Sequence, residues 1–307
     1  MANVELQVRP TRLEAGDSMN NLLLRGWRRM TATVRCCTGR RVGGLALVIV
    51  TVCLMQVGHA QRRNPGIMPL DRNGVPTWEV DPAFKEDVFT FVRIKYNSAR
   101  SWSRWATDFP DSDLNFSYRL QQLTSLKVDP NGRILELTDP ELFRYPFVYL
   151  IEPGDLEFNG DEVKSLRRYL LNGGFLMVDD FWGEAEWSNF YYEIKKVFPD
   201  REPIELPLDH PLFHCVYDLK EKPQVPSIGQ ALMGRSQGIT WERPDAKEVH
   251  YKGIFDDKGR LMVIICHNTD LGDGWEREGE DPWYFTEFSE KKAYPMGINI
   301  VFYAMTH

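Results

Sequence analysis

The fold is decided by one stretch, residues 147–183, which reads FVYLIEPGDLEFNGDEVKSLRRYLLNGGFLMVDDFWG. Its two ends, residues 147–152 and 175–180, are apolar runs of strand length, rich in β-branched and aromatic side chains. Between them, Asn159 is placed to cap a helix that carries acidic residues in its first turn, and Gly173 is placed to end it. This order predicts a βαβ unit with two parallel strands.

The rest of the chain repeats the alternation of strands and helices. We expect further strands at 88–94, 133–137, 202–207 and 261–268, and helices at 111–126, 184–198 and 296–306. Because nearly continuous apolar strands are typical of a sheet covered on both faces, the predicted fold is α/β, a three-layer sandwich around a mainly parallel sheet. In such sheets, ligands bind beyond the carboxyl ends of the strands.

A segment near the N-terminus has the three parts of a secretory signal peptide. A basic stretch precedes an apolar run from Leu45 to Val57, and the small residues Gly58 and Ala60 follow it. This run is shorter than the roughly 20 residues that a membrane-spanning helix needs. We therefore expect residues 1–60 to be a signal peptide and the protein to be exported to the periplasm or secreted. An uncleaved N-terminal membrane anchor is the alternative, and only then would the membrane be a partner.

The remaining chain divides into an arm and a domain. Residues 61–83 hold four Pro and two Gly with little periodicity, which predicts an arm or linker. Residues 84–307 carry the pattern of a packed domain.

The charge balance excludes one class of partner. Residues 1–60 hold eight Arg and three acidic residues, which leaves 29 of the 37 basic and 41 of the 44 acidic groups for the rest of the chain. Nucleic-acid binding needs a basic face, so we expect no nucleic-acid partner for this acidic domain.

Two cysteines, Cys215 and Cys266, follow the signal segment. In an exported protein they could form one disulfide, and two buried free thiols are the equal alternative. Cys266 lies within an apolar strand, where burial makes a thiol inert.

Four blocks of the sequence resemble the bacterial family called domain of unknown function 4159: residues 105–128, 145–183, 198–214 and 297–306. The resemblance extends from about Phe89 to the C-terminus. It implies a fold similar to that of the class I glutamine amidotransferases, a flavodoxin-like α/β sandwich. Those enzymes carry a Cys nucleophile at the turn that corresponds here to residues 179–183, where this chain has no Cys or Ser. Since a carboxylate is a poor substitute for a thiolate in acyl transfer, we assign no catalytic residue and predict no cofactor.

Adjacent carboxylates at this turn, Asp179 and Asp180, are the first candidates for ligand binding. At the end of a strand, they could share a proton, bind a metal or accept hydrogen bonds from a polar ligand. The structural alternative is that one caps the following helix while the other pairs with a basic side chain.

Four further residues are candidates for lining the same site: Trp182, His210, Asp108 and Asp111. His210 and His214 are four residues apart, but the zinc-protease pattern fails because Pro211 follows the first His. The acidic residues after Asp108 do not complete a calcium loop, since Phe116 stands where that loop needs Gly. Which metal the site takes, if any, stays open at this stage.

A second acidic segment, residues 268–276, follows the strand at 261–268 and carries Asp270, Asp273 and Glu276 around two Gly. A loop that lines the site and an ordinary turn are both consistent with this composition.

Two functions from different classes fit these patterns. The first is an exported, non-catalytic module that binds a small polar ligand or an envelope protein. The second is a metal- or carboxylate-dependent hydrolase at the cell envelope, in which Asp179, Asp180 and His210 are metal ligands or acid–base groups. Convergence of these three side chains would favour the hydrolase.

Overall fold

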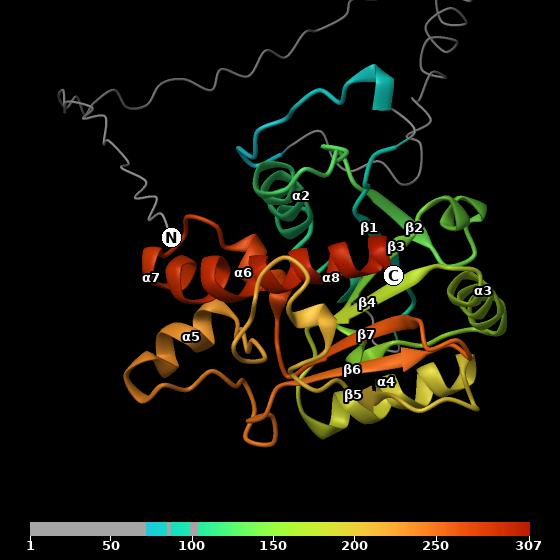
Figure 1. Cartoon of the computed structure of the whole chain (residues 1–307). Helices are drawn as coiled ribbons and strands as arrows, with labels where there is room; N and C mark the ends of the chain where they lie inside the picture. Colours follow the sequence, from blue (N-terminus) through green and yellow to red (C-terminus); the bar gives the residue numbers. More distant parts are fainter. Residues whose placement is uncertain (1–71, 85–86, 99–103) are drawn as a thin grey trace, which may run out of the picture. The chain divides into compact units, whose positions relative to one another are not determined.

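The computed structural model describes residues 72–84, 87–98 and 104–307, drawn in colour in Figure 1. The predicted signal peptide and the first part of the predicted arm lie outside this range. None of the helices in the described part of the chain has the length and apolar character needed to cross a membrane.

A seven-stranded sheet forms the centre of the domain, with strand order β2-β1-β3-β4-β7-β6-β5. Its strands are β1 (Val92–Lys95), β2 (Arg133–Glu136), β3 (Phe147–Ile151), β4 (Phe175–Asp179), β5 (Ile204–Glu205), β6 (His250–Phe255) and β7 (Leu261–His267). Five neighbouring strands, from β2 to β7, run parallel, whereas β6 pairs antiparallel with both β7 and β5. The mainly parallel α/β sheet is therefore confirmed.

Helices cover both faces of the sheet, as Figure 1 shows. On one face, α3 (Gly160–Leu171) and α4 (Gly183–Val197) pack over the strands. On the other face lie α2 (Asp111–Leu123), α6 (Leu271–Glu276) and α8 (Tyr294–Thr306). Two short helices, α5 (Ile228–Gly234) and α7 (Pro282–Tyr284), extend this second layer, and a π-helical segment, Phe285–Ala293, joins α7 to α8. The arrangement is the predicted three-layer sandwich.

The strands alternate between these two layers. In β3, Phe147 and Tyr149 face the α2–α6–α8 layer, while Val148 and Leu150 face α3 and α4. All of these side chains are buried, because both faces of the sheet are covered. By the same alternation, Asp179 at the end of β4 points towards the α2–α6–α8 layer.

The helix predicted between β3 and β4 begins and ends as its sequence requires. Asn159 accepts hydrogen bonds from the backbone N–H groups of Asp161 and Glu162, and Glu162 accepts one from the Asn159 N–H in return. This capping box satisfies the free donors of the first turn. Gly173, with φ of 104°, reverses the chain after the last turn, a conformation that favours glycine.

The cysteines are free thiols, but only Cys266 is buried as that alternative expected, whereas Cys215 is exposed. Neither Cys215 nor Cys266 forms a disulfide. Cys266 is fully buried in β7, and burial raises the pKa of its thiol well above the usual value, which makes it the inert core residue that we expected.

One buried ion pair joins the sheet to α2. The guanidinium of Arg93 on β1 donates through Nε to Asp113 Oδ2 at 2.9 Å, and both side chains are fully buried. Its Nη1 donates to the backbone carbonyls of Trp105 and Thr107, and its Nη2 donates to Ser112 Oγ. The pair therefore also fixes the segment that leads to Asp108.

We expect Arg93→Met to destabilise the domain by about 3–5 kcal/mol, because it leaves the Asp113 carboxylate buried without its partner. The matched change Lys95→Met, also on β1, removes an exposed ion pair with Glu136 of β2 and should cost less than about 1 kcal/mol. Urea unfolding of both variants measures the difference. Equal losses would show that the buried pair does not hold α2 on the sheet.

Candidate functional site

The carboxyl ends of the parallel strands meet at one edge of the sheet, and acidic side chains gather there. Glu152 follows β3, Asp179 ends β4, and Asp180 is the first residue beyond it. Asp270 follows β7 and begins α6, while Asp108 comes from the segment before α2. Four separate segments therefore supply this cluster, as the edge rule for parallel sheets predicts.

Asp180 has a backbone conformation that few residues with a side chain adopt. Its φ is 56°, in the left-handed region, at the turn between β4 and α4. Its side chain is only 8% exposed. No hydrogen bond or ion pair reaches its carboxylate within the residues that the structure describes. A buried carboxylate without a partner is costly, so this group needs a proton or a cation.

Asp179 is buried beside Asp180 but has partners on one side. Its Oδ2 accepts hydrogen bonds from the Tyr149 hydroxyl and from the backbone N–H of Gly272, both at 3.1 Å. Its Oδ1 is buried and accepts none from the described part of the chain. Burial raises the pKa of Asp179 to about 7, against these hydrogen bonds, which lower it.

Three carboxylates converge closely enough to hold one metal ion. An oxygen from each of Asp108, Asp180 and Asp270 lies within 4.8 Å of the other two. Asp270 is fixed because its Oδ1 caps α6, accepting from the Asp273 N–H at 2.7 Å. Asp108 Oδ2 is buried and has no hydrogen-bond donor among the described residues. We call Asp108, Asp180 and Asp270 the aspartate triad.

Negative charge dominates the electrostatics of the triad, and the positive charge of Arg93 offsets only part of it, at Asp108. Burial raises the pKa of all three carboxyl groups well above the usual value, and neighbouring carboxylates raise it further. For Asp180, the neighbours that act most strongly after burial are Glu152 and Asp108. A divalent cation would remove this penalty, because it favours the ionised form of each ligand.

Gly272 lets the backbone of α6 approach this edge. A Cβ atom at this position would lie 2.6 Å from Asp108 Oδ2 and 2.9 Å from the Tyr149 hydroxyl. Both distances are shorter than real side chains allow, so a larger residue would displace Asp108 or the helix. The position of the triad therefore depends on this glycine.

The structural alternative for Asp179 and Asp180 does not hold. The N-cap of α4 is Trp182, whose side chain accepts no capping hydrogen bond. Glu186 and Asp245 accept from the first N–H groups instead. Trp182 is buried, 3% exposed, and its indole Nε1 has no partner in the described structure.

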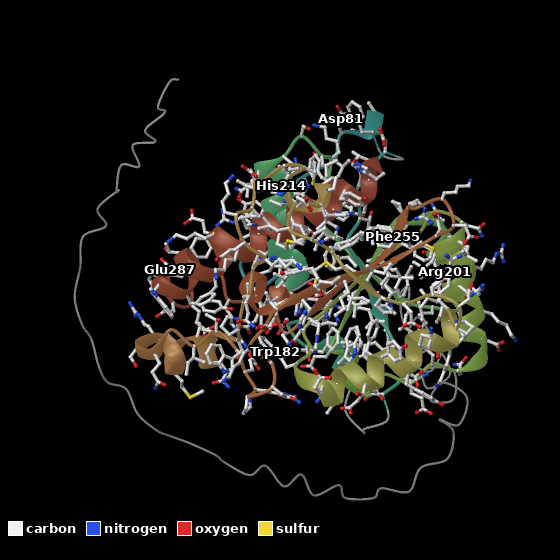
Figure 2. All side chains as sticks on the ribbon, turned by 60° about the horizontal axis from the view of Figure 1, so that its bottom comes forward. Asp81, Trp182, Arg201, His214, Phe255 and Glu287 are labelled. Atoms are coloured by element: carbon white, nitrogen blue, oxygen red, sulfur yellow. The ribbon has the colours of Figure 1, made fainter. Side chains whose placement is uncertain are left out.

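Two other candidates lie apart from the triad. Asp111 accepts a hydrogen bond from Asn73 of the arm at 2.7 Å and belongs to neither close group of carboxylates. His210 packs against Phe255 and Tyr303. His250 begins β6 and pairs with His267 at the carboxyl end of β7, so Phe255, the last residue of β6, lies at the opposite end of the strands. Figure 2 shows Phe255 well away from Trp182. The convergence of Asp179, Asp180 and His210 that would favour the hydrolase is therefore absent, because His210 lies at the opposite end of the strands.

Sequence reasoning weighed the segment 268–276 without assigning its residues to the site. The structure makes it a cap and a short helix, α6, with Asp270 in the triad. The available signal was the spacing of Asp270, Asp273 and Glu276, three residues apart, which puts carboxylates on adjacent positions of one helical face.

An α/β domain with an acidic site at the carboxyl edge of its sheet is the class that these features define. The sequence matches the family described as Domain of unknown function (DUF4159) over residues 90–305, and the chain belongs to that family. A search of curated proteins found no match to the chain.

The raised pKa of Asp179 predicts that it weakens the metal-free fold as the pH rises. Its folded pKa, about 7, exceeds the ordinary value of 3.8, so the native state holds a proton that the unfolded chain releases. Its stabilising contribution is thus present below about pH 4 and is lost as the pH rises towards 7, by at most about 1.4 kcal/mol per unit.

Asp179→Asn should remove this loss, since the amide cannot ionise. Urea unfolding in a chelator at several pH values measures it: the stability of the variant relative to wild type should increase between pH 4 and 7. Parallel stability curves would contradict the assigned shift.

Proposed function

We propose that this domain binds a divalent metal ion through Asp108, Asp180 and Asp270. The observation that carries the proposal is the buried Asp180 carboxylate, which has no partner in the described structure and converges with two other carboxylates. Three oxygen ligands without a His or Cys suit a hard cation, Mg²⁺ or Ca²⁺, better than Zn²⁺ or Cu²⁺.

The surroundings of the triad favour an ion over a larger ligand at this point. The triad is mostly buried, with Asp108 the most exposed of the three. This supports entry of a small cation past Asp108, with water or a polar ligand completing the coordination.

The ion serves a binding role rather than covalent catalysis in this proposal. The turn after β4 offers Asp180 where a nucleophile would stand, and a carboxylate does not replace a thiolate in acyl transfer. We also propose that the fold is similar to that of the class I glutamine amidotransferases, and the turn supports this because a positive φ between a strand and a helix is the geometry of a nucleophile elbow.

A second candidate, metal-dependent hydrolysis, is favoured by one observation. Asp108 belongs to two close groups of carboxylates, and a shared ligand is a feature of sites that activate water with two metal ions. His210 takes no part in this version, because it lies at the opposite end of the strands.

We also propose that the protein is exported, on the strength of the basic, apolar and small-residue pattern that ends at Ala60. N-terminal sequencing of the protein from its native membrane and soluble fractions tests this. A mature start just after Ala60 would support cleavage, and an intact N-terminus in the membrane fraction would support the anchor. An intact N-terminus in the soluble fraction would contradict both.

Addition of Mg²⁺ or Ca²⁺ should stabilise the metal-free protein, because the ion binds only the folded site. At 100 times the dissociation constant the gain is about 2.7 kcal/mol. Asp180→Asn should abolish this gain by removing one ligand and its charge. Thermal unfolding with and without the ion measures both effects.

The matched control is Asp257→Asn, which removes a carboxylate that is 90% exposed and lies in the turn between β6 and β7, at the end of β7 opposite the triad. It should keep the full gain. The proposal fails if neither ion stabilises the wild-type protein, or if Asp180→Asn gains as much as wild type.

A further inference from the structure

A second group of carboxylates adjoins the aspartate triad. Oxygens of Asp108, Asp273 and Glu276 lie within 4.8 Å of one another, so Asp108 belongs to both groups. By ligand type, the two groups are equivalent: each consists of carboxylates at the same edge of the sheet. The two groups differ in whether a positively charged side chain of the protein already pairs with their carboxylates.

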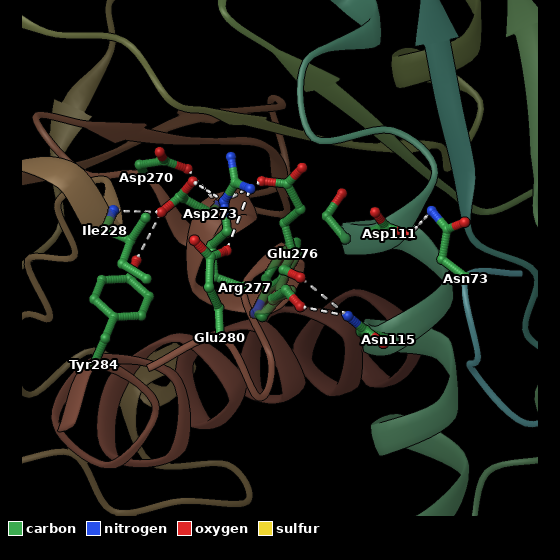
Figure 3. Close-up of polar contacts among 12 residues, drawn as sticks. Asn73, Asp111, Asn115, Ile228, Asp270, Asp273, Glu276, Arg277, Glu280 and Tyr284 are labelled. Carbon is green, nitrogen blue, oxygen red and sulfur yellow. Dashed lines mark hydrogen bonds and ion pairs between the residues drawn. The ribbon is translucent and has the colours of Figure 1, made fainter. Parts of the chain in front are cut away.

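The guanidinium of Arg277 lies among the carboxylates of the second group. Its Nε lies 2.6 Å from Glu276 Oε2 and 3.3 Å from Asp273 Oδ1, and its Nη1 lies 3.4 Å from Glu280 Oε2. Figure 3 shows the guanidinium between these three carboxylates. An arginine side chain stays protonated throughout the physiological range, so this positive charge is permanent.

Hydrogen bonds to one oxygen of Asp273 leave its other oxygen, Oδ1, facing the guanidinium of Arg277. Its Oδ2 accepts hydrogen bonds from the Ile228 N–H at 2.6 Å and from the Tyr284 hydroxyl at 3.1 Å, as Figure 3 shows. Its Oδ1 then faces Arg277. Asp273 is only 4% exposed, so its carboxylate cannot turn to water without breaking these contacts.

The triad has no such cation. Within the described residues, no Lys or Arg forms an ion pair with Asp108, Asp180 or Asp270. Among the described residues, the fold therefore supplies a directly paired cation to the second group only.

We infer that Arg277 is the fixed cation of the second group and thereby limits this site to a single divalent ion. The inference rests on the proposed function, since it assigns the number of ions that the same edge accepts. A second divalent ion would have to displace the guanidinium from Asp273 and Glu276 while sharing Asp108 with the first ion. Replacing Arg277 by a neutral side chain leaves the three carboxylates of the second group free for that ion.

Counting bound ions in the full chain tests the inference. Metal-free protein is titrated with Mn²⁺, and the ions per chain are read from calorimetry and from the free Mn²⁺ signal in electron paramagnetic resonance. We expect one ion for wild type, one for Arg277→Lys, and two for Arg277→Met. Arg277→Met combined with Glu276→Gln should return to one, because the second group then lacks a ligand.

Two controls keep the count interpretable. Arg119→Met removes a partly buried arginine that pairs with Glu278, and it should still bind one ion. Circular dichroism establishes that each variant is folded. If Arg277→Met does not fold, Arg277→Gln, which retains hydrogen-bonding capacity without the charge, replaces it and should bind two.

The outcomes separate the inference from the proposed function. Two ions on wild type would overturn the inference while supporting a metal site, and so would one ion on a folded Arg277→Met or Arg277→Gln variant. No ion on wild type would overturn the proposed function itself, and the inference with it.

Discussion

Parallel pairing of β4 with β3 and β7 is the constraint on which the site depends. In register, Ile151 lies beside Asp179, and Val178 lies beside Ile265. Since parallel strands all end at one edge, the turns after the three strands meet there, although they are far apart in sequence. The helix between β3 and β4, with its capping box and terminal glycine, makes this parallel connection possible. The carboxylates converge as a consequence of the sheet.

The buried carboxylates of the domain fall into two kinds: one has an arginine as its ion-pair partner, and those of the triad have none among the described residues. Arg93 and Asp113 neutralise each other, and the guanidinium also donates to two backbone carbonyls and to the Ser112 hydroxyl. A short distance along the same segment, Asp108 faces Asp180 and Asp270 without any such partner in the described structure. Because a buried carboxylate without a countercharge is costly, a fold that gives Asp113 an ion-pair partner and gives none to the triad among the described residues is consistent with a cation that arrives from solution.

The sequence predicted the sheet and two of the three triad residues, Asp108 and Asp180, and the misses have physical causes. The βαβ unit and the turn at Asp180 follow from local signals, namely apolar runs, a cap and a glycine. Helix α6 was not predicted because Gly272 and Gly274 lower its intrinsic helix propensity. Tertiary packing requires both glycines, since a Cβ atom at either position would lie about 2.5 Å from other side chains. His210 was misplaced because only the tertiary path of β5 and β6, the antiparallel part of the sheet, shows which end of the strands it reaches.

The central claim is that the aspartate triad holds a divalent cation, and crystallography with Mn²⁺ tests it most directly. Anomalous difference maps from crystals of the protein grown with Mn²⁺ would locate the ion without assumptions about its ligands. The account predicts one peak bounded by Asp108, Asp180 and Asp270, at about 2.0–2.6 Å from an oxygen of each. The absence of a peak there, with the three carboxyl groups instead hydrogen-bonded to one another through shared protons, would contradict it.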